Sequence, residues 1–381
     1  MSKSYLIKPP LSIFNEYDVC SRIGEALNEH TYYTLGVAIG SELQEIYGLH
    51  TLLLGRDSRA SSDVFAEALI KGLLLSGIHI IDMGYLPTPV LYFAMHALQC
   101  QSGLMITASH NPADYNGLKI TLGGKHYYGQ CLRAIHQRII DKQFVMDNQE
   151  RAKLVQYPTE QIINKYIQTI INSMRLIKKL RIVVDCGHAV AGHVAPQLLS
   201  ALGCDVIALH CEVQSTFSNR YPDPSIEENL TDLREMVCEQ RADLGVAFDG
   251  DGDRLGMVDN KGDIIAADYL LLAFADALLK KKANSAVVCD LKCTQHLQDY
   301  ITAHHGRTII TPTGTAHIMA SMIEHQAAIG GEFCGHFYFR DRWIHSDDAI
   351  YAAARAIEML SAQLYEPHLF FCAVSSLAQY Y

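Results

Sequence analysis

The stretch Asp249-Gly-Asp-Gly-Asp-Arg254 constrains this chain more than any other. It lies between two short apolar runs, residues 244–248 and 255–258, which predict buried strands. Three carboxylates at alternate positions, Asp249, Asp251 and Asp253, therefore share a tight, glycine-containing loop at a strand end. Like charges this close repel one another unless a cation lies among them, and oxygen ligands favour a hard ion such as Mg²⁺ or Ca²⁺. The stretch predicts a metal site.

Two other interpretations compete with a Mg²⁺ site. A calcium loop of the EF-hand kind needs Gly at its sixth position and Glu at its twelfth, and these positions hold Arg254 and Asn260. A solvated acidic turn without any metal remains open. The guanidinium of Arg254 beside the carboxylates favours a phosphate ligand, because a metal and an arginine can each bind phosphoryl oxygens.

Composition limits the classes of protein to consider. The 381 residues are enough for two or three domains, and 49% hydrophobic with 19% charged residues is typical of globular proteins with apolar cores. A net charge of −10 argues against a nucleic-acid partner. We expect no secretory signal and no membrane span, because no apolar run is long enough. The eleven cysteines form no C-x-x-C pair, which predicts reduced thiols and a cytoplasmic location.

A strand–turn–helix–strand pattern occurs three times along the chain, at intervals of roughly a hundred residues. The expected strands include 51–54, 78–82, 103–107, 181–185, 205–209, 286–290 and 307–311; a helix is expected over 190–202, and residues from Arg151 to Leu180 read as helical. The pattern predicts three consecutive, similar α/β domains with mixed sheets flanked by helices. Loops that follow the strands would then face one active-site cleft between the domains.

Three further stretches carry candidate functional groups. Ser109 and His110 follow the strand at 103–107, where a serine can stand exposed as a nucleophile, although most such serines cap the backbone. The stretch 330–336 places a carboxylate and an imidazole between glycines, which suits sugar hydroxyls or a purely structural loop. Arg56 and Arg59, in the turn after the strand at 51–54, either bind anions or pair with carboxylates.

Taken together, these motifs resemble the α-D-phosphohexomutase family, and most closely its bacterial phosphomannomutase/phosphoglucomutase members. The resemblance rests on Thr107-Ala-Ser-His-Asn-Pro112, on 249–254 and on Gly331-Glu-Phe-Cys-Gly-His336, in the family's order and spacing. The stretches 115–119, 184–187, 221–224 and 347–351 agree as well.

The resemblance implies a reversible transfer of phosphate between O1 and O6 of a hexose, mannose or glucose, through a hexose 1,6-bisphosphate. Ser109 would carry the phosphoryl group, and one of its oxygens would complete the Mg²⁺ shell of the three aspartates. Lys119, His110 and His336 would move protons, and Arg254 would neutralise charge. Substrate would contact the residues Lys292, Gly314, Glu332 and Cys334.

The sequence departs from the family pattern at several positions. Residues 14–21 keep the frame of a segment that usually carries two arginines but lack both: the segment ends in Cys20 and Ser21, and Arg22 is displaced by two positions. Cys334 replaces a serine, and Thr315 replaces a histidine. We expect domain I at 1–153, domain II at 154–256, domain III at 257–371, and at 372–381 the start of a linker to a fourth domain that the chain lacks. The departures leave open a degenerate homologue that binds sugar phosphates or a partner without turnover, a hydrolase, or a phosphoglucosamine mutase. A monomer is slightly favoured.

Overall fold

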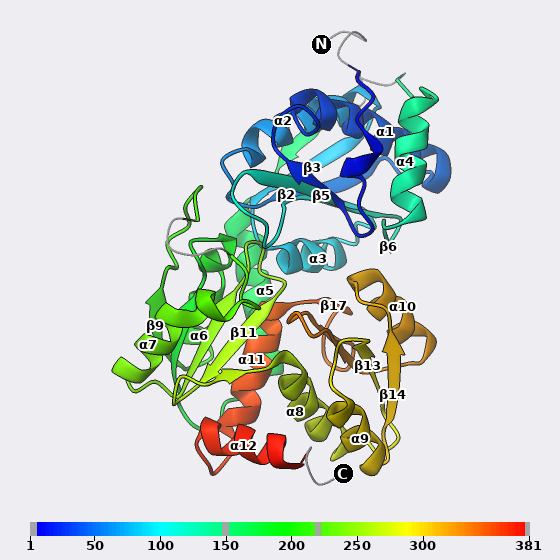
Figure 1. The fold of residues 1–381 in the computed structure, drawn as a ribbon. Coiled ribbons are helices and arrows are strands. Elements are labelled where there is room, and N and C mark those ends of the chain that lie inside the picture. Colours follow the sequence, from blue (N-terminus) through cyan, green and yellow to red (C-terminus); the bar gives the residue numbers. More distant parts are fainter. Residues whose placement is uncertain (1–5, 147–151, 218–221, 378–381) are drawn as a thin grey trace. The chain divides into compact units, whose positions relative to one another are not determined.

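The computed structural model describes residues 6–146, 152–217 and 222–377. Within these ranges the chain forms three sheets, each mixing parallel and antiparallel strands and flanked by helices (Figure 1). This confirms the three α/β domains expected from the sequence. The chain divides into two compact units, residues 1–163 with 214–216 and residues 164–213 with 217–381. The first sheet belongs to the first unit, and the other two sheets belong to the second.

The first sheet has the strand order β1-β5-β4-β2-β3-β7, with β6 paired to β5. Strands β4, β2, β3 and β7 run parallel, and β1, β5 and β6 are antiparallel additions at one side. Helices α1 and α2 pack at a glycine contact, where a Cβ on Gly36 would lie 3.1 Å from the Cα of Gly72. The elements are η2 (Leu11–Ile13), β1 (Val19–Arg22), α1 (Glu29–Tyr47), β2 (Thr51–Arg56), α2 (Ser62–Leu75), β3 (His79–Tyr85), α3 (Thr88–Ala97), β4 (Gly103–Ile106), β5 (Tyr115–Leu122), β6 (Lys125–His126), α4 (Gln130–Ile140) and β7 (Leu154–Gln156).

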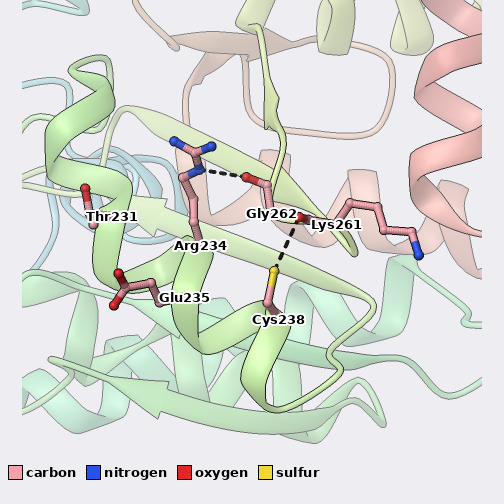
Figure 2. A pocket seen from close by; sticks show the side chains of 6 residues that line it. All are labelled: Thr231, Arg234, Glu235, Cys238, Lys261 and Gly262. Atoms are coloured by element: carbon pink, nitrogen blue, oxygen red, sulfur yellow. Dashed lines mark hydrogen bonds between the residues drawn. The ribbon is translucent and has the colours of Figure 1, made fainter.

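The second sheet has the order β12-β11-β10-β8-β9, with β10, β8 and β9 parallel. The turn between β11 and β12 is tied to α7: Arg234 Nε donates to the Gly262 carbonyl (2.7 Å), and Cys238 Sγ donates to the Lys261 carbonyl (3.3 Å) (Figure 2). The elements are α5 (Thr159–Ser173), β8 (Arg181–Asp185), η3 (Val190–His193), α6 (Ala195–Ala201), β9 (Asp205–Leu209), η4 (Glu227–Leu230), α7 (Thr231–Glu239), β10 (Leu244–Phe248), β11 (Leu255–Asp259) and β12 (Ile264–Ile265).

The third sheet has the order β14-β13-β15-β16-β17, with β14, β13 and β15 parallel. Helix α11 contacts β10 and β11 of the second sheet and β16 of the third. Its N-cap residue, the buried Asp348, accepts from the Tyr351 amide (2.8 Å), Tyr166 Oη (2.8 Å) and Trp343 Nε1 (2.9 Å). The elements are α8 (Ala267–Leu279), β13 (Ala286–Asp290), α9 (Gln295–Ala303), β14 (Arg307–Thr311), α10 (Thr315–Glu324), β15 (Ile329–Gly331), β16 (Phe337–Phe339), β17 (Ser346–Asp347), α11 (Ala349–Ser361) and α12 (Pro367–Leu377).

Two of the expected helices are wrong in part. Residues 190–202 form the 3₁₀ turn η3 and the shorter helix α6, because Pro196 has no N–H and Gly192 lies against the Cys211 carbonyl, 2.1 Å from where a Cβ would stand. In the expected helix from Arg151 to Leu180, Arg151 lies outside the described residues. Residues 154–156 are instead the edge strand β7, and helix α5 covers only 159–173.

The expected domain boundaries differ from the limits of the sheets. The boundary between residues 256 and 257 falls inside β11, and the second sheet continues to Ile265. Strand β7 starts at Leu154 and pairs with β3, so the first sheet continues beyond residue 153. The expected linker start at residue 372 falls inside α12. We propose that the first domain includes β7 and that the second ends after β12.

No helix among the described residues is both long enough and apolar enough to cross a membrane.

A buried arginine holds the connection between β4 and β5. The Arg59 guanidinium pairs with Asp57 (Nε–Oδ2 3.1 Å), and both side chains are inaccessible to solvent. Its Nη atoms donate to four carbonyls of the connection, those of Ser109, Asn111, Pro112 and Tyr115, at 2.6–3.1 Å. Of the two possibilities for the arginines, pairing with carboxylates is observed: Arg56 pairs with Asp63 and Asp82, both at 2.8 Å.

Replacing Arg59 by Met should therefore destabilise the protein strongly. The substitution leaves the buried Asp57 carboxylate uncompensated and removes the donors to four carbonyls, a change that costs roughly 3–5 kcal/mol when one member of a buried pair is lost. Urea unfolding followed by circular dichroism measures the loss. The control is Arg22→Met, which breaks an exposed pair with Asp114 (2.7 Å) and should cost less than about 1 kcal/mol. Equal losses for the two variants would contradict this role of Arg59.

Candidate functional site

Ser109 is held in a conformation that is unfavourable for a side chain with a Cβ. Its φ is +49°, in the left-handed region, in the turn that follows β4. The amide of Ser109 donates to Thr107 Oγ1 (2.9 Å), and Arg59 fixes its carbonyl (2.7 Å). The hydroxyl oxygen lies 3.2 Å from Nδ1 of His110. Local backbone strain that the surroundings enforce is concentrated at functional sites in proteins.

Lys119 and Cys20 belong to neighbouring strands of the same unit. Lys119 lies half-buried on β5 and pairs in register with Met105 of β4, while Cys20 on β1 pairs with Gly117. Burial, followed by the nearby Asp18, raises the pKa of the Cys20 thiol to about 12, against the opposing effects of Arg59 and Lys119. The neutral Cys20 thiol contacts Asn111, whose Nδ2 lies 3.6 Å from its Sγ. The displaced Arg22 forms an exposed ion pair with Asp114.

The three aspartates of the second unit form a buried oxygen cluster. Asp249, Asp251 and Asp253 are 0%, 0% and 1% exposed, and one carboxylate oxygen of each lies within 4.8 Å of the others. The loop is shaped by Asp249, whose Oδ1 accepts the amides of Asp253 (3.0 Å) and Arg254 (3.1 Å), and by Gly252 at φ +77°. A set of buried carboxylates without nitrogen or sulfur suits a hard divalent cation, so the residues present fit Mg²⁺.

Arg254 and His336 join this loop to the loop at 331–336 within the second unit. Arg254 Nε lies 3.1 Å from His336 Nε2, and His336 Nδ1 lies 3.2 Å from Asp347 Oδ2 and 3.8 Å from Asp253 Oδ1. Although burial disfavours its charge, the neighbouring Cys334, Asp249 and Asp253 raise the pKa of Arg254 above its usual value. The loops also meet through their backbones, because Leu255 N donates to the Gly335 carbonyl (2.9 Å).

Glu332 is buried and already has two protein donors. Its Oε1 accepts the amide of Gly314, and its Oε2 accepts the hydroxyl of Tyr338 (2.6 Å). Burial, followed by Glu332 itself, raises the pKa of Tyr338 well above its usual value. Each carboxylate oxygen keeps a further lone pair, so Glu332 can still accept a hydrogen bond from a ligand. Cys334 is half-buried, and burial raises the pKa of its thiol.

Asp290 connects the loops of the third domain and was not singled out from the sequence. It ends β13 and is 1% exposed. Its Oδ1 accepts the Phe333 amide (3.2 Å) and the Cys293 thiol (3.2 Å), and its Oδ2 accepts Thr313 Oγ1 (2.9 Å). The three loops that it ties together carry the predicted substrate residues Lys292 (exposed), Gly314, Glu332 and Cys334.

Residues missed by sequence reasoning act through partners that are distant in the chain. Asp290 bonds residues up to 43 positions away. Arg59 was a candidate from the sequence, but its bonds to carbonyls up to 56 positions away were not predicted. An aspartate at the carboxyl end of a buried parallel strand was the available signal for Asp290. Asp347, part of the quoted motif at 347–351, had been given no role, and it supports both His336 and Thr315 (Oγ1–Oδ2 3.2 Å). Thr315 thus occupies a structural position where the family pattern has histidine.

The structure places the predicted residues in two groups. Ser109, His110 and Lys119 belong to the first unit, where Ser109 and His110 are in contact. The aspartate triad, Arg254 and the predicted residues of the third domain belong to the second unit, where His336 and Arg254 bridge the metal loop and the 331–336 loop.

Two cavities lie in the second unit. One of about 500 Å³ is lined by Leu255, Ile265, Phe333 and Cys334, among others, and the other of about 360 Å³ is the pocket between α7 and the β11–β12 turn shown in Figure 2. Neither is lined by the aspartate triad. Of the predicted substrate residues, only Cys334 lines the larger one.

Comparison with known proteins finds one family model for each of the three sheets. Three family models match in order: phosphoglucomutase/phosphomannomutase alpha/beta/alpha domain I over residues 11–146, domain II over 164–262 and domain III over 266–368. These ranges place the predicted Ser109 in the match to domain I, the aspartate triad in the match to domain II and the 331–336 loop in the match to domain III.

Relatives and solved structures agree with the family models. A phosphomannomutase/phosphoglucomutase of Pseudomonas putida is 42% identical over 352 residues, which are 92% of this chain and 74% of the relative. A phosphoglucomutase of Neisseria gonorrhoeae is 37% identical over 350 residues, 92% of this chain and 75% of the relative. The crystal structure of a phosphoglucomutase/phosphomannomutase family protein from Burkholderia thailandensis has a TM-score of 0.90 and 34% identity, covering 96% of this chain and 80% of that one. The chain belongs to the phosphoglucomutase/phosphomannomutase family.

Proposed function

We propose that this chain is a phosphohexomutase, which interconverts the 1-phosphate and 6-phosphate of mannose and glucose through a phosphoserine at Ser109 and a hexose 1,6-bisphosphate. Membership of the family supports the reaction class. The observation that carries the assignment to Ser109 is its strained, backbone-clamped turn, with φ +49° and a histidine nitrogen 3.2 Å from the hydroxyl oxygen.

The phosphoserine transfers its phosphoryl group to the free O1 or O6 hydroxyl of a hexose monophosphate. The bond between Ser109 Oγ and phosphorus breaks as the bond from the sugar oxygen forms, and the sugar hydroxyl loses its proton. Transfer of the other phosphoryl group from the bisphosphate to Ser109 Oγ then regenerates the phosphoserine and releases the isomer. His110, Lys119 and His336 are the groups that we assign to proton movement.

Asp249, Asp251 and Asp253 would hold Mg²⁺, which supplies positive charge to phosphoryl oxygens when it is bound. Arg254 adds a guanidinium that its buried acidic surroundings keep charged. A loose phosphoryl-transfer transition state depends mainly on positioning and on neutralisation of charge. The Mg²⁺ site and Arg254 would provide the neutralisation of charge.

Sugar binding is assigned to the third domain. Glu332 would accept hydrogen bonds from ring hydroxyls through its remaining lone pairs, and Gly314 is positioned by the same carboxylate. Lys292 is exposed in the loop after β13 and can pair with a phosphate. Cys334 offers a thiol that hydrogen-bonds more weakly than a hydroxyl. A cytoplasmic location is part of the proposal, supported by a structure in which none of the eleven cysteines forms a disulfide bond.

Replacing Ser109 by Ala tests the central assignment. Intact-mass spectrometry of purified wild-type protein should show a phosphoryl adduct that the variant lacks. Mutase activity should fall at least roughly a thousandfold, because the covalent carrier is gone. A coupled assay with mannose 1-phosphate, glucose 1-phosphate and a trace of bisphosphate measures turnover. Wild-type protein without turnover would favour a degenerate homologue, release of free phosphate would favour a hydrolase, and a preference for glucosamine phosphate would favour a phosphoglucosamine mutase.

Replacing Asp251 by Asn should remove metal binding without unfolding the chain. The substitution keeps the shape of the side chain but deletes one of three buried charges that would hold the cation. We expect Mg²⁺ affinity, measured by calorimetry, and mutase activity both to fall roughly a hundredfold or more. The matched control is Asp263→Asn, at an exposed aspartate of the adjoining β11–β12 hairpin. Unchanged affinity in the Asp251 variant would refute the metal assignment.

Replacing Asp290 by Ala should loosen the sugar-binding loops. Lost bonds to a charged acceptor are each worth about 1.5–3 kcal/mol, so KM should rise about tenfold or more while phosphorylation of Ser109 and Mg²⁺ affinity stay unchanged. Asp290→Asn keeps one acceptor oxygen and should recover part of the loss. The control is Asp276→Asn, which weakens a bond to Tyr300 (2.8 Å) in the same domain. A similar rise in KM in the control would show a general effect on stability instead.

A further inference from the structure

Two thiols lie in contact at the edge of the second sheet. The Sγ atoms of Cys186 and Cys211 are 3.5 Å apart, although 25 positions separate the residues in sequence. Neither has a part in the mutase chemistry described above. A disulfide bond needs the sulfur atoms about 2.05 Å apart, so the two atoms must come closer by roughly 1.5 Å.

The sheet itself creates this contact. Strands β8 and β9 are parallel and pair in register up to Asp185 and Leu209. The pairing continues past both strands, because Cys186 N donates to the Leu209 carbonyl (3.3 Å) and His188 N donates to the His210 carbonyl (2.7 Å). In this register Cys186 lies beside His210, one position before Cys211. The two cysteines therefore lie in the loops that directly follow these adjacent strands, where their sulfur atoms meet.

The two thiols differ in exposure. Cys186 is 0% exposed, whereas Cys211 is half-buried and is the more accessible residue of the two. The hydrogen bond with Cys186 lowers the pKa of Cys211 from the usual value for a thiol, against the opposing effect of burial. A lower pKa favours the thiolate, which is the nucleophilic form of cysteine. Because Cys186 is fully buried, Cys211 is the member that a reagent would meet first.

A second pair of neighbouring thiols provides an internal comparison. Cys289 and Cys293 are 0% and 6% exposed, and the Cys293 thiol donates to the Asp290 carboxylate (3.2 Å). The hydrogen bond with Cys289 and burial both raise the pKa of Cys293 far above its usual value. Two thiols are thus close together at both places, but of these two pairs only Cys186 and Cys211 include a half-buried member.

We propose that Cys186 and Cys211 form a redox-active dithiol that small hydroperoxides convert into an intramolecular disulfide. The Cys211 thiolate attacks one peroxide oxygen, the O–O bond breaks, and a sulfenic acid forms with release of hydroxide or alkoxide. The Cys186 sulfur then attacks the Cys211 sulfur, the S–O bond breaks, and the Cys186 proton leaves with the hydroxyl group as water. The two thiols lose two electrons, and the peroxide is reduced by two. Thiols such as glutathione reverse the reaction by exchange.

The test treats the folded full chain with hydrogen peroxide, followed by alkylation, proteolysis without reduction and mass spectrometry. We expect a cross-linked peptide pair containing Cys186 and Cys211 that disappears on treatment with dithiothreitol. It should form at least roughly tenfold faster than any cross-link between Cys289 and Cys293, because reactivity follows thiolate character and exposure. The control variant Cys293→Ser should leave the cross-link unchanged.

Two single variants identify the order of events. In Cys186→Ser the sulfenic acid on Cys211 has no resolving thiol, so a dimedone probe should label Cys211 and no cross-link should form. In Cys211→Ser, labelling of Cys186 should be at least roughly tenfold weaker, because that thiol is fully buried. Failure of wild-type protein to form the cross-link, or preferential labelling of Cys186, would overturn the proposal. These readouts need no substrate, so they are independent of whether the chain proves to be a mutase.

Discussion

The loops of the second unit depend on one constraint: three buried carboxylates lie close together and their charges must be compensated. Asp249, Asp251 and Asp253 bring three negative charges within 4.8 Å of one another inside the protein. Charges in such a place require compensation, because burial removes the water that would screen them. Arg254 supplies a fixed positive charge from the same loop. His336 links Arg254 to the fourth carboxylate, Asp347, and thereby fixes the loop at 331–336 against the metal loop.

Buried charged side chains also give the functional loops their rigidity in both units. Arg59 holds the Ser109 turn by donating to four carbonyls, and Asp290 holds three loops of the third domain by accepting from their donors. Loop backbones lack the repeated hydrogen bonds of strands, so a multivalent buried side chain performs that task. The apolar sheets supply stable edges, and a few internal charges determine the shape of the loops that leave them.

The strands were the most predictable elements. The runs 181–185, 205–209, 286–290 and 307–311 were expected and are observed as β8, β9, β13 and β14. Strands β8 and β13 are buried along nearly their whole length, and parallel strands of this kind read as continuous apolar runs in a sequence. Strand β7 was missed because its three residues are exposed and it exists only through pairing with β3. The helix predicted over 190–202 was too long, because the contact of Gly192 with the Cys211 carbonyl joins residues that are distant in the sequence.

The sequence by itself determined the chemical groups of the candidate site: a serine after a strand, three alternating aspartates, and a loop with glutamate and histidine. Each of these is a short run of residues that follows a strand, so its chemical groups can be identified from the sequence alone. Tertiary structure alone decided that Glu332 is bound by Gly314 and Tyr338, that Arg254 donates to His336, and that Cys186 meets Cys211. Such contacts depend on strand register and on the packing of one domain against another, and neither is encoded in the spacing of neighbouring residues.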